Sequence, residues 1–333
     1  MKQEEQTGPA IATGDLTRRS FFPLLMCGCA VPWMLGTTGC TGELISSFEF
    51  QSAIYKSVNE ALALKRSGFT LWQMQSVDDS IMMGYILLTS QNKVIVIDGG
   101  DADQCQYVEY FLGLLGNRVA AWYLSHPHDD HVGALATMLS RGTNIQIDHI
   151  YASFPTREWV AMLPDDEDES ATLGMYDLFA SANAQIIPVS LGQTDTYDEM
   201  SVEVLSVNNP EITQNGVNNS SMLLKVSDAN KAVLFLGDLG VEEWTKLSSF
   251  PNLSSFSADY VQVAHHGWTD GIEDFYRQIA PTYSLFPTTS GEVNGDEGYP
   301  AAATQSEQTL LALLNQMGVH TNYFSFDQLC RID

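Results

Sequence analysis

Basic residues are scarce in this chain of 333 residues. It has 15 lysines and arginines against 41 aspartates and glutamates, which gives a formal net charge of −26 at pH 7. A long polyanion would be repelled at range, and no basic cluster is available to neutralise a phosphate backbone, which argues against nucleic acid as a partner. Small phosphoesters, neutral esters and amides remain possible substrates. An alternative explanation of the acidic composition is that it only keeps the protein soluble.

Cysteine is rare as well. Three of the five cysteines, Cys27, Cys29 and Cys40, lie near the N-terminus, which leaves Cys105 and Cys330 for the rest of the chain. Two distant thiols exclude a disulfide framework and lack the spacing of a zinc ligand pair. A single long-range bridge between them stays open.

The apolar stretch 21–35 is too short to span a bilayer, which takes about 20 residues. Arg18 and Arg19 precede it, so residues 1–40 are predicted to form a twin-arginine export signal that sends the protein to the cell envelope or the exterior. Cys40 follows a small residue and could carry a lipid, which would be the only attachment to a membrane. The alternative is a basic pair before a buried helix, which the prolines in the stretch disfavour.

Histidines are unevenly distributed. Of seven, three lie close together with a carboxylate between them, as His126, His128, Asp130 and His131, and none lies between His149 and His265. The cluster stands where an apolar run gives way to a helical pattern, so it occupies a strand-to-helix turn that can aim four side chains at one point. Imidazole and carboxylate ligands suit zinc, with manganese as a rival, and predict a site for one or two ions. The alternative is a solvated, histidine-rich loop.

Further candidate ligands follow later strands. Asp238 comes directly after a strand predicted over residues 231–236, and the carboxyl end of a strand is where sites on layered sheets form, so it is a candidate bridging ligand. A helix cap would also explain it. His265 and His266 follow a strand predicted over 259–264, and we expect His265 to bind metal and His266 to act in catalysis or to brace the site.

Asp98 ends a third predicted strand, over residues 93–97. Its carboxylate is expected to brace the metal loop from behind, or to cap the next helix. Strand and helix patterns along the chain indicate an α/β fold, in which two sheets form a sandwich with helices outside.

The ordered set of motifs resembles the metallo-β-lactamase superfamily of metallohydrolases. It consists of residues 94–100, the cluster from His126 to His131, residues 236–238 and residues 265–267. The resemblance implies a four-layer αββα sandwich of two mixed sheets over residues 69–333, after a linker and helix at 41–68. Within the superfamily, the branch of the DNA-uptake competence proteins is the most similar.

The chain departs from the family pattern at one metal ligand. The family has a further histidine before Asp238, where this sequence has Asn218 and Asn219. Similarity to the competence branch puts an asparagine there, and an amide oxygen is a weaker zinc donor than imidazole. We therefore expect one firmly held ion and one labile ion, with Asn218 and Asn219 as weak or supporting groups, or else as an ordinary turn.

The sequence thus predicts an exported metallohydrolase that uses a metal-bound hydroxide. Asp130 and His266 are its predicted catalytic residues, and a small phosphoester is the predicted substrate. A lactam or lactone hydrolase is one alternative, and a non-catalytic metal-binding protein is another. The oligomeric state is left undetermined.

Overall fold

The computed structural model describes residues 47–77, 80–163, 169–250 and 253–333. The predicted export signal and Cys40 lie outside these ranges, so they stay predictions. In the described part of the chain, no helix has both the length and the apolar character needed to cross a membrane.

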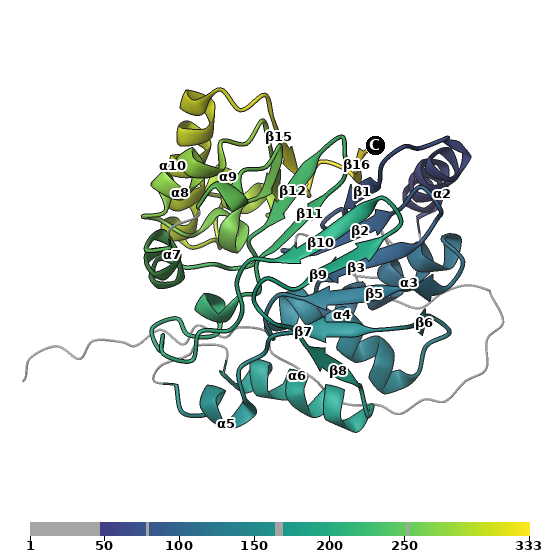
Figure 1. Cartoon of the computed structure of the whole chain (residues 1–333), viewed down its shortest axis with the longest axis horizontal. Helices are drawn as coiled ribbons and strands as arrows, with labels where there is room; N and C mark the ends of the chain where they lie inside the picture. Colours follow the sequence, from purple (N-terminus) through teal and green to yellow (C-terminus); the bar gives the residue numbers. More distant parts are fainter. Residues whose placement is uncertain (1–46, 78–79, 164–168, 251–252) are drawn as a thin grey trace, which may run out of the picture. The chain divides into compact units, whose positions relative to one another are not determined.

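Six strands from the first part of the chain and the C-terminal strand build a seven-stranded mixed sheet (Figure 1). Its strands, in spatial order, are β16 (Cys330–Ile332), β1 (Thr70–Gln73), β2 (Gly84–Leu88), β3 (Val94–Asp98), β5 (Ala121–Leu124), β7 (Ile150–Ala152) and β8 (Ile186–Pro188). The four strands from β16 to β3 pair antiparallel, and β3, β5, β7 and β8 run parallel.

The second half repeats this plan in a second seven-stranded sheet. Its order is β15 (Thr321–Phe324), β14 (Tyr283–Phe286), β13 (Tyr260–Gln262), β12 (Ala232–Phe235), β11 (Leu224–Ser227), β10 (Met200–Val204) and β9 (Thr194–Tyr197). The strands from β9 to β12 are antiparallel, and those from β12 to β15 are parallel. A separate two-stranded ladder joins β4 (Arg118–Val119) to β6 (Gln146–Ile147).

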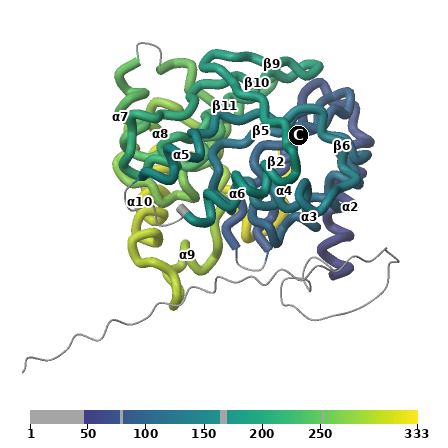
Figure 2. Tube along the Cα trace, turned by 90° about the horizontal axis from the view of Figure 1, so that it is seen from below, coloured from purple at the N-terminus to yellow at the C-terminus, as the bar shows by residue number. Residues whose placement is uncertain are grey.

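Helices cover the outer face of each sheet, the two groups lying on opposite sides in Figure 2. The first group is α2 (Phe48–Ala63), α3 (Cys105–Leu114), α4 (Asp129–Arg141) and α6 (Glu169–Ser181). The short helix α5 (Arg157–Val160) packs instead in a small separate cluster, through Val160. The second is α7 (Val241–Ser248), α8 (Glu273–Ile279), α9 (Ser290–Asn294) and α10 (Ala301–Met317). Short 3-10 turns are η1 (Ala102–Gln104), η2 (Asn218–Ser220), η3 (Leu253–Phe256) and η4 (Ala264–Gly267).

The apolar pattern of the strands explains this layering. Along β1, Leu71 faces the core between the two sheets, whereas Trp72 faces the core under α2 and α3. Every residue of β2, β3 and β5 is buried, as expected for strands covered on both faces. The fold is therefore α/β, with two mixed sheets flanked by helices in four layers, as predicted.

Some elements differ from the sequence-based assignment. The apolar pattern of residues 145–151 is typical of one strand, but the segment forms two short strands, β6 and β7, because exposed residues at 148 and 149 interrupt it. Strands β8, β9 and β10 were not predicted. Only β10 alternates buried with half-buried residues, whereas β8 and β9 are short edge strands with no buried residue. The last strand, β16, was also missed, and it crosses to the edge of the first sheet.

Parallel strands place their carboxyl ends at one edge of a sheet. The segments after β3, β5, β12 and β13 all emerge at such edges, and these are the segments that carry the predicted site residues. The fold therefore collects side chains that are distant in sequence.

Candidate metal centre

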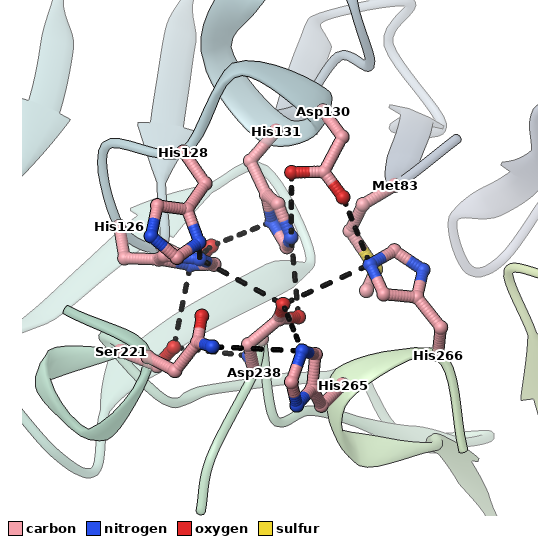
Figure 3. Close-up of polar contacts among 12 residues, drawn as sticks. Met83, His126, His128, Asp130, His131, Ser221, Asp238, His265 and His266 are labelled. Atoms are coloured by element: carbon pink, nitrogen blue, oxygen red, sulfur yellow. Dashed lines mark hydrogen bonds and ion pairs between the residues drawn. The ribbon is translucent and has the colours of Figure 1, made fainter. Parts of the chain in front are cut away.

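The histidine cluster occupies the turn between β5 and α4, as predicted. His128 is the N-cap of α4, and Asp130 lies in the first turn of that helix. His126 and His128 face each other, with Nε2 of His126 3.1 Å from Nδ1 of His128 (Figure 3). Both residues are buried, at 0% and 8% exposure, so the turn directs them into the protein.

Asp238 lies between two groups of ligand atoms. His126, His128 and Asp238 form one group, and Asp130, His131 and His266 form the other, with the ligand atoms of each group within 4.8 Å of one another. Oδ1 of Asp238 is 3.1 Å from Nε2 of His131, whereas its Oδ2 is 3.8 Å from Nε2 of His126. A carboxylate in this position can bridge two cations.

Asp98 supports the histidine loop from behind. Its Oδ1 accepts the backbone N–H of Ser125 at 2.7 Å, and its Oδ2 accepts the Ser125 hydroxyl at 2.8 Å. Nδ1 of His131 lies 3.0 Å from the same Oδ2. Such a contact fixes the ring orientation and leaves Nε2 facing the cluster, which is the bracing position predicted for Asp98.

The turn that carries Asp238 is braced by groups that the sequence analysis did not single out. Gln262 accepts the backbone N–H groups of Leu236 and Gly237 at 2.7 and 2.8 Å and donates to the carbonyl of Gly237 at 3.0 Å. Gly237 has φ +52, and a Cβ there would lie 2.9 Å from Oγ of Ser221 and 3.0 Å from Cβ of Ser125. Only glycine allows this close approach of the two loops. A polar residue inside the apolar strand β13 was the available signal for Gln262.

The sequence predicts His265 as the metal ligand and His266 as a catalytic or bracing residue, but the structure places the two side chains differently. His266, not His265, joins Asp130 and His131, with Nε2 of His266 3.1 Å from Oδ2 of Asp130. Its ring is completely buried, and its Nδ1–H donates to the carbonyl of Pro287 at 2.6 Å. Nε2 of His265 lies 3.6 Å from Oδ2 of Asp238. The local backbone is the reason, since both residues have positive φ angles that turn adjacent side chains in unexpected directions.

A buried carboxyl stands behind this turn. Glu307 of α10 accepts a hydrogen bond from Nε1 of Trp268 at 3.2 Å and one from the hydroxyl of Thr288 at 2.6 Å. Trp268 follows the histidine turn, and Thr288 follows Pro287, which holds His266. Burial raises the pKa of Glu307 from 4.5 to about 7. No motif in the sequence marked Glu307.

Asn218 and Asn219 have different roles. Asn218 faces the site, with its Nδ2 3.5 Å from Nε2 of His265. Asn219 does not, because its amide group donates to the Gln214 carbonyl and to Glu242 and accepts the backbone N–H of Glu243. These bonds tie η2 to the start of α7. The geometry therefore gives Asn219 a structural position rather than that of the predicted weak ligand.

The buried imidazoles and carboxylates of the cluster shift one another's pKa values. Burial raises the pKa of Asp238, but the surrounding imidazoles, His131 first, outweigh it and leave that pKa well below its usual value of 3.8. Burial lowers the pKa of His266, whereas the carboxylates of Asp238 and Asp130 raise it, to about 9 overall. Imidazolium–carboxylate pairs hold protons that a divalent cation would displace on binding.

The donor set fits a divalent metal. Nε2 of His131 lies 3.1 Å from Oδ1 of Asp238, and Nε2 of His266 lies 3.1 Å from Oδ2 of Asp130. All are buried except Oδ2 of Asp130, yet these two close contacts lack the geometry of a hydrogen bond, so His131, His266 and Asp238 keep donor atoms free for an ion. At zinc–ligand distances of about 2.1 Å, tetrahedral donors stand roughly 3.4 Å apart. The separations of 3.1 to 3.9 Å between facing donors of this cluster bracket that value. Nitrogen and carboxylate oxygen donors are also the types that such ions prefer.

The histidines outside the cluster take no part in it. His149 and His320 are both exposed, on β-sheet margins away from these groups. The two described cysteines, Cys105 and Cys330, are buried free thiols and form no bridge with each other.

Several solved structures are similar to this chain. The metallo-beta-lactamase fold protein YhfI from Bacillus subtilis is 12% identical over 80% of this chain and 100% of that one, with a TM-score of 0.48. A variant of CmlA beta-hydroxylase is 10% identical over 86% of this chain but only 62% of its own, with a TM-score of 0.48. A diphosphatase from the PhnP family is 10% identical over 80% of this chain and 97% of that one, with a TM-score of 0.42.

These structural similarities are too distant to assign an activity, and no curated protein matches the chain. The sequence profile of the metallo-beta-lactamase superfamily is more decisive, because it matches residues 85–317. That range contains both groups of ligand atoms and the strands that position them. The chain belongs to the metallo-beta-lactamase superfamily, whose members are mostly metal-dependent hydrolases.

Proposed function

We propose that this protein is a zinc-dependent hydrolase of small phosphoesters. The observation that carries the proposal is the arrangement around Asp238, which faces His131 through one carboxylate oxygen and His126 through the other. Two adjacent cations held in this way can clamp the oxygens of a phosphoester during an in-line displacement. Manganese is the alternative metal, because two of the candidate ligands, Asp130 and Asp238, are carboxylates.

One carboxylate of the cluster is proposed to handle protons. A divalent ion supplies a nucleophile at neutral pH because it lowers the pKa of water to about 7. Asp130 is half-buried, at 18% side-chain exposure, whereas the other members of the two groups are buried, so Asp130 can exchange protons with solvent. Its Oδ2 lies 3.1 Å from Nε2 of His266. We assign to Asp130 the acceptance and orientation of the water proton, and to His266, through the same Nε2, a place among the ligands of the ion beside that carboxylate.

Charge favours a small substrate. The net charge of −26 repels polyanions, and the main charges that act on Asp130, Asp238 and His266 are those of histidines and aspartates. The metal ions themselves would have to neutralise the charge of a single phosphate. The similarity to the competence-protein branch therefore extends, in our proposal, to the chemistry of phosphoesters and not to polymeric DNA.

An uncharged ester or lactone is the second candidate substrate. A cavity of about 600 Å³ lies beside the carboxyl ends of β7 and β8, and no charged residue lines it. Its walls include Phe154, Tyr176 and Phe179. Because β7 pairs directly with β5, which leads into His126, this cavity could take an apolar group of a neutral substrate.

Hydrolysis assays with the full chain test the proposal. The zinc-loaded and manganese-loaded proteins are given a bis-aryl phosphate, an aryl monophosphate and a chromogenic lactam. We expect the bis-aryl phosphate to be hydrolysed fastest, and Asp238→Ala to lose both turnover and metal. Faster hydrolysis of the lactam would favour the second candidate. Metal uptake without hydrolysis of any substrate would indicate a metal-binding protein instead.

We also propose export by the twin-arginine route, with lipid attachment at Cys40. Arg18 and Arg19 before a short apolar stretch support this, and the acidic composition suits a protein outside the cell. Replacing both arginines by lysine should retain the protein in the cytoplasm, as measured by fractionation. Cys40→Ala should release exported protein from the membrane fraction. Unchanged fractionation of the double lysine variant would refute the export route.

A further inference from the structure

His265 and His266 are neighbours in sequence, but their side chains diverge. Their φ angles are +48° and +57°, in the left-handed region that residues other than glycine rarely adopt. The ring centroids are 6.1 Å apart, with an angle of 60° between the ring planes. Each such residue costs about 1–2 kcal/mol, and backbone strain of this kind is found mainly at functional sites.

The surrounding structure holds the turn in this conformation. The backbone N–H of His265 donates to the carbonyl of Gly237 at 3.0 Å, and its carbonyl accepts the N–H of Trp268 at 2.7 Å. His266 is fixed separately by its bond to Pro287. The two side chains are therefore fixed in different orientations, and that of His266 points to the end of the site that contains Asp130.

His265 points to the other end of the site. Its Nε2 lies 3.6 Å from Oδ2 of Asp238, and the same oxygen lies 3.8 Å from Nε2 of His126. Nε2 of His266 is as close to that oxygen, at 3.7 Å, but it lies closer to Oδ2 of Asp130, at 3.1 Å, and so belongs to the other end. His126 and His265 are then placed as donors to one cation. The side chain of His265 is 21% exposed, so an ion could reach it from solvent.

The end of the site near His126 lacks a donor that the family pattern would supply. No histidine lies between His149 and His265, and Asn218 occupies the expected region. Nδ2 of Asn218, a hydrogen-bond donor, faces Nε2 of His265 at 3.5 Å. Oδ1 of Asn218 is buried and has no hydrogen-bond partner among the described residues.

We propose that His265 supplies the missing nitrogen at the His126–His128 end of the site, while His266 completes the Asp130–His131 end. One strained turn would then supply a ligand to each ion. At the His126–His128 end, a third imidazole would hold the ion much more tightly than an asparagine ligand would. The inference rests on metal binding in the proposed function but on no substrate.

Zinc binding by the full chain tests this inference through His265→Asn. Asparagine tolerates a positive φ, so the turn should fold, and its short side chain cannot reach the imidazole position. We expect wild type to bind two equivalents and the variant to bind one of them at least about tenfold more weakly. His149→Asn, at an exposed histidine, is the control and should bind as wild type does.

A double-mutant cycle identifies which ion is affected. If His265 and His126 hold the same ion, the effects of His265→Asn and His126→Ala on zinc affinity should be strongly non-additive. The effects of His265→Asn and His131→Ala should be closer to additive. Unfolding curves in chelator establish that each variant is folded, and His265→Gly, which also accepts the positive φ, replaces any variant that is not.

Two results would overturn the inference. One is wild-type affinity for both ions in His265→Asn, and the other is coupling of His265 to His131 rather than to His126. Because zinc affinity is measured without substrate, absence of hydrolysis would count against the proposed function alone. Active protein with unperturbed zinc binding in His265→Asn would count against this inference alone.

Discussion

Replacing Asp98 by asparagine should weaken metal binding without disturbing the fold. Asp98 has φ +54, a conformation that asparagine accepts as readily as aspartate, and the two side chains have nearly the same size. Asp98 is 1% exposed and bonds the Ser125 backbone, the Ser125 hydroxyl and His131. The substitution therefore changes charge and hydrogen-bond direction and little else.

The expected magnitude follows from the tautomer of His131. In the variant, the amide oxygen can still accept the Ser125 N–H, but the amide nitrogen replaces the oxygen that lies 3.0 Å from Nδ1 of His131. Two donors then face each other, so His131 favours the tautomer with its proton on Nε2, the atom that faces Asp238. Loss of such a supporting contact typically costs about 10-fold to 100-fold in metal affinity. This corresponds to about 1.4–2.8 kcal/mol.

Competition with a chromogenic chelator measures this affinity. Asp103→Asn, at an exposed residue of η1, removes the same charge from the same region and should bind zinc as wild type does. Unfolding in excess chelator should show a loss of similar size for Asp98→Asn, about 1–3 kcal/mol, because a buried donor loses its acceptor. Unchanged zinc affinity in Asp98→Asn, or equal loss in both variants, would refute the assigned role of Asp98.

Three further predictions concern stability. Because the pKa of Glu307 is raised, its carboxyl binds a proton more tightly in the folded protein than in the unfolded chain. The protonated carboxyl therefore stabilises the fold at low pH, and this stabilisation is lost as the pH rises from about 4.5 to about 7. Glu307→Gln cannot ionise, so its urea midpoint relative to wild type should rise between pH 5 and pH 8, and a pH-independent difference would contradict this. Gly133→Ala should lose about 1–3 kcal/mol in thermal unfolding, because its Cβ would lie 2.7 Å from the backbone nitrogen of Ala102. Gly174→Ala, with no atom within 4 Å, should instead gain about 0.5–1 kcal/mol, and similar effects of the two substitutions would show that the contact is unimportant. Removal of zinc by a chelator should lower the melting temperature, since zinc at 100 times its Kd contributes about 2.7 kcal/mol, and an unchanged melting temperature would argue against a buried metal site.

Much of the site could be predicted because its members are marked locally. The spacing of His126, His128 and His131 is dense enough to indicate metal on its own, and Asp238 directly follows an apolar strand. Asp98 was found by the same reasoning, since it ends a strand of five buried residues. In each case the periodicity of the strand fixes where the polar side chain emerges.

The supporting residues could not be predicted in this way. Gln262 and Glu307 act through contacts with segments 25 and 39 residues away, and nothing in their neighbouring sequence marks those contacts. The sequence left Asn219 open between a weak ligand and a supporting group, because its amide bonds a helix that begins about 20 residues later. Such contacts are set by packing between elements.

The sequence by itself determined the family, the four-layer fold and the set of side chains available to bind metal, because hydrophobic periodicity and motif order are local properties of the chain. Only the tertiary structure decided how those side chains are divided between the two ends of the site. Two left-handed residues separate His265 from His266, and backbone conformation at a turn depends on what packs around it. Adjacent positions in the sequence therefore do not reveal which of the two faces Asp130 and which faces Asn218.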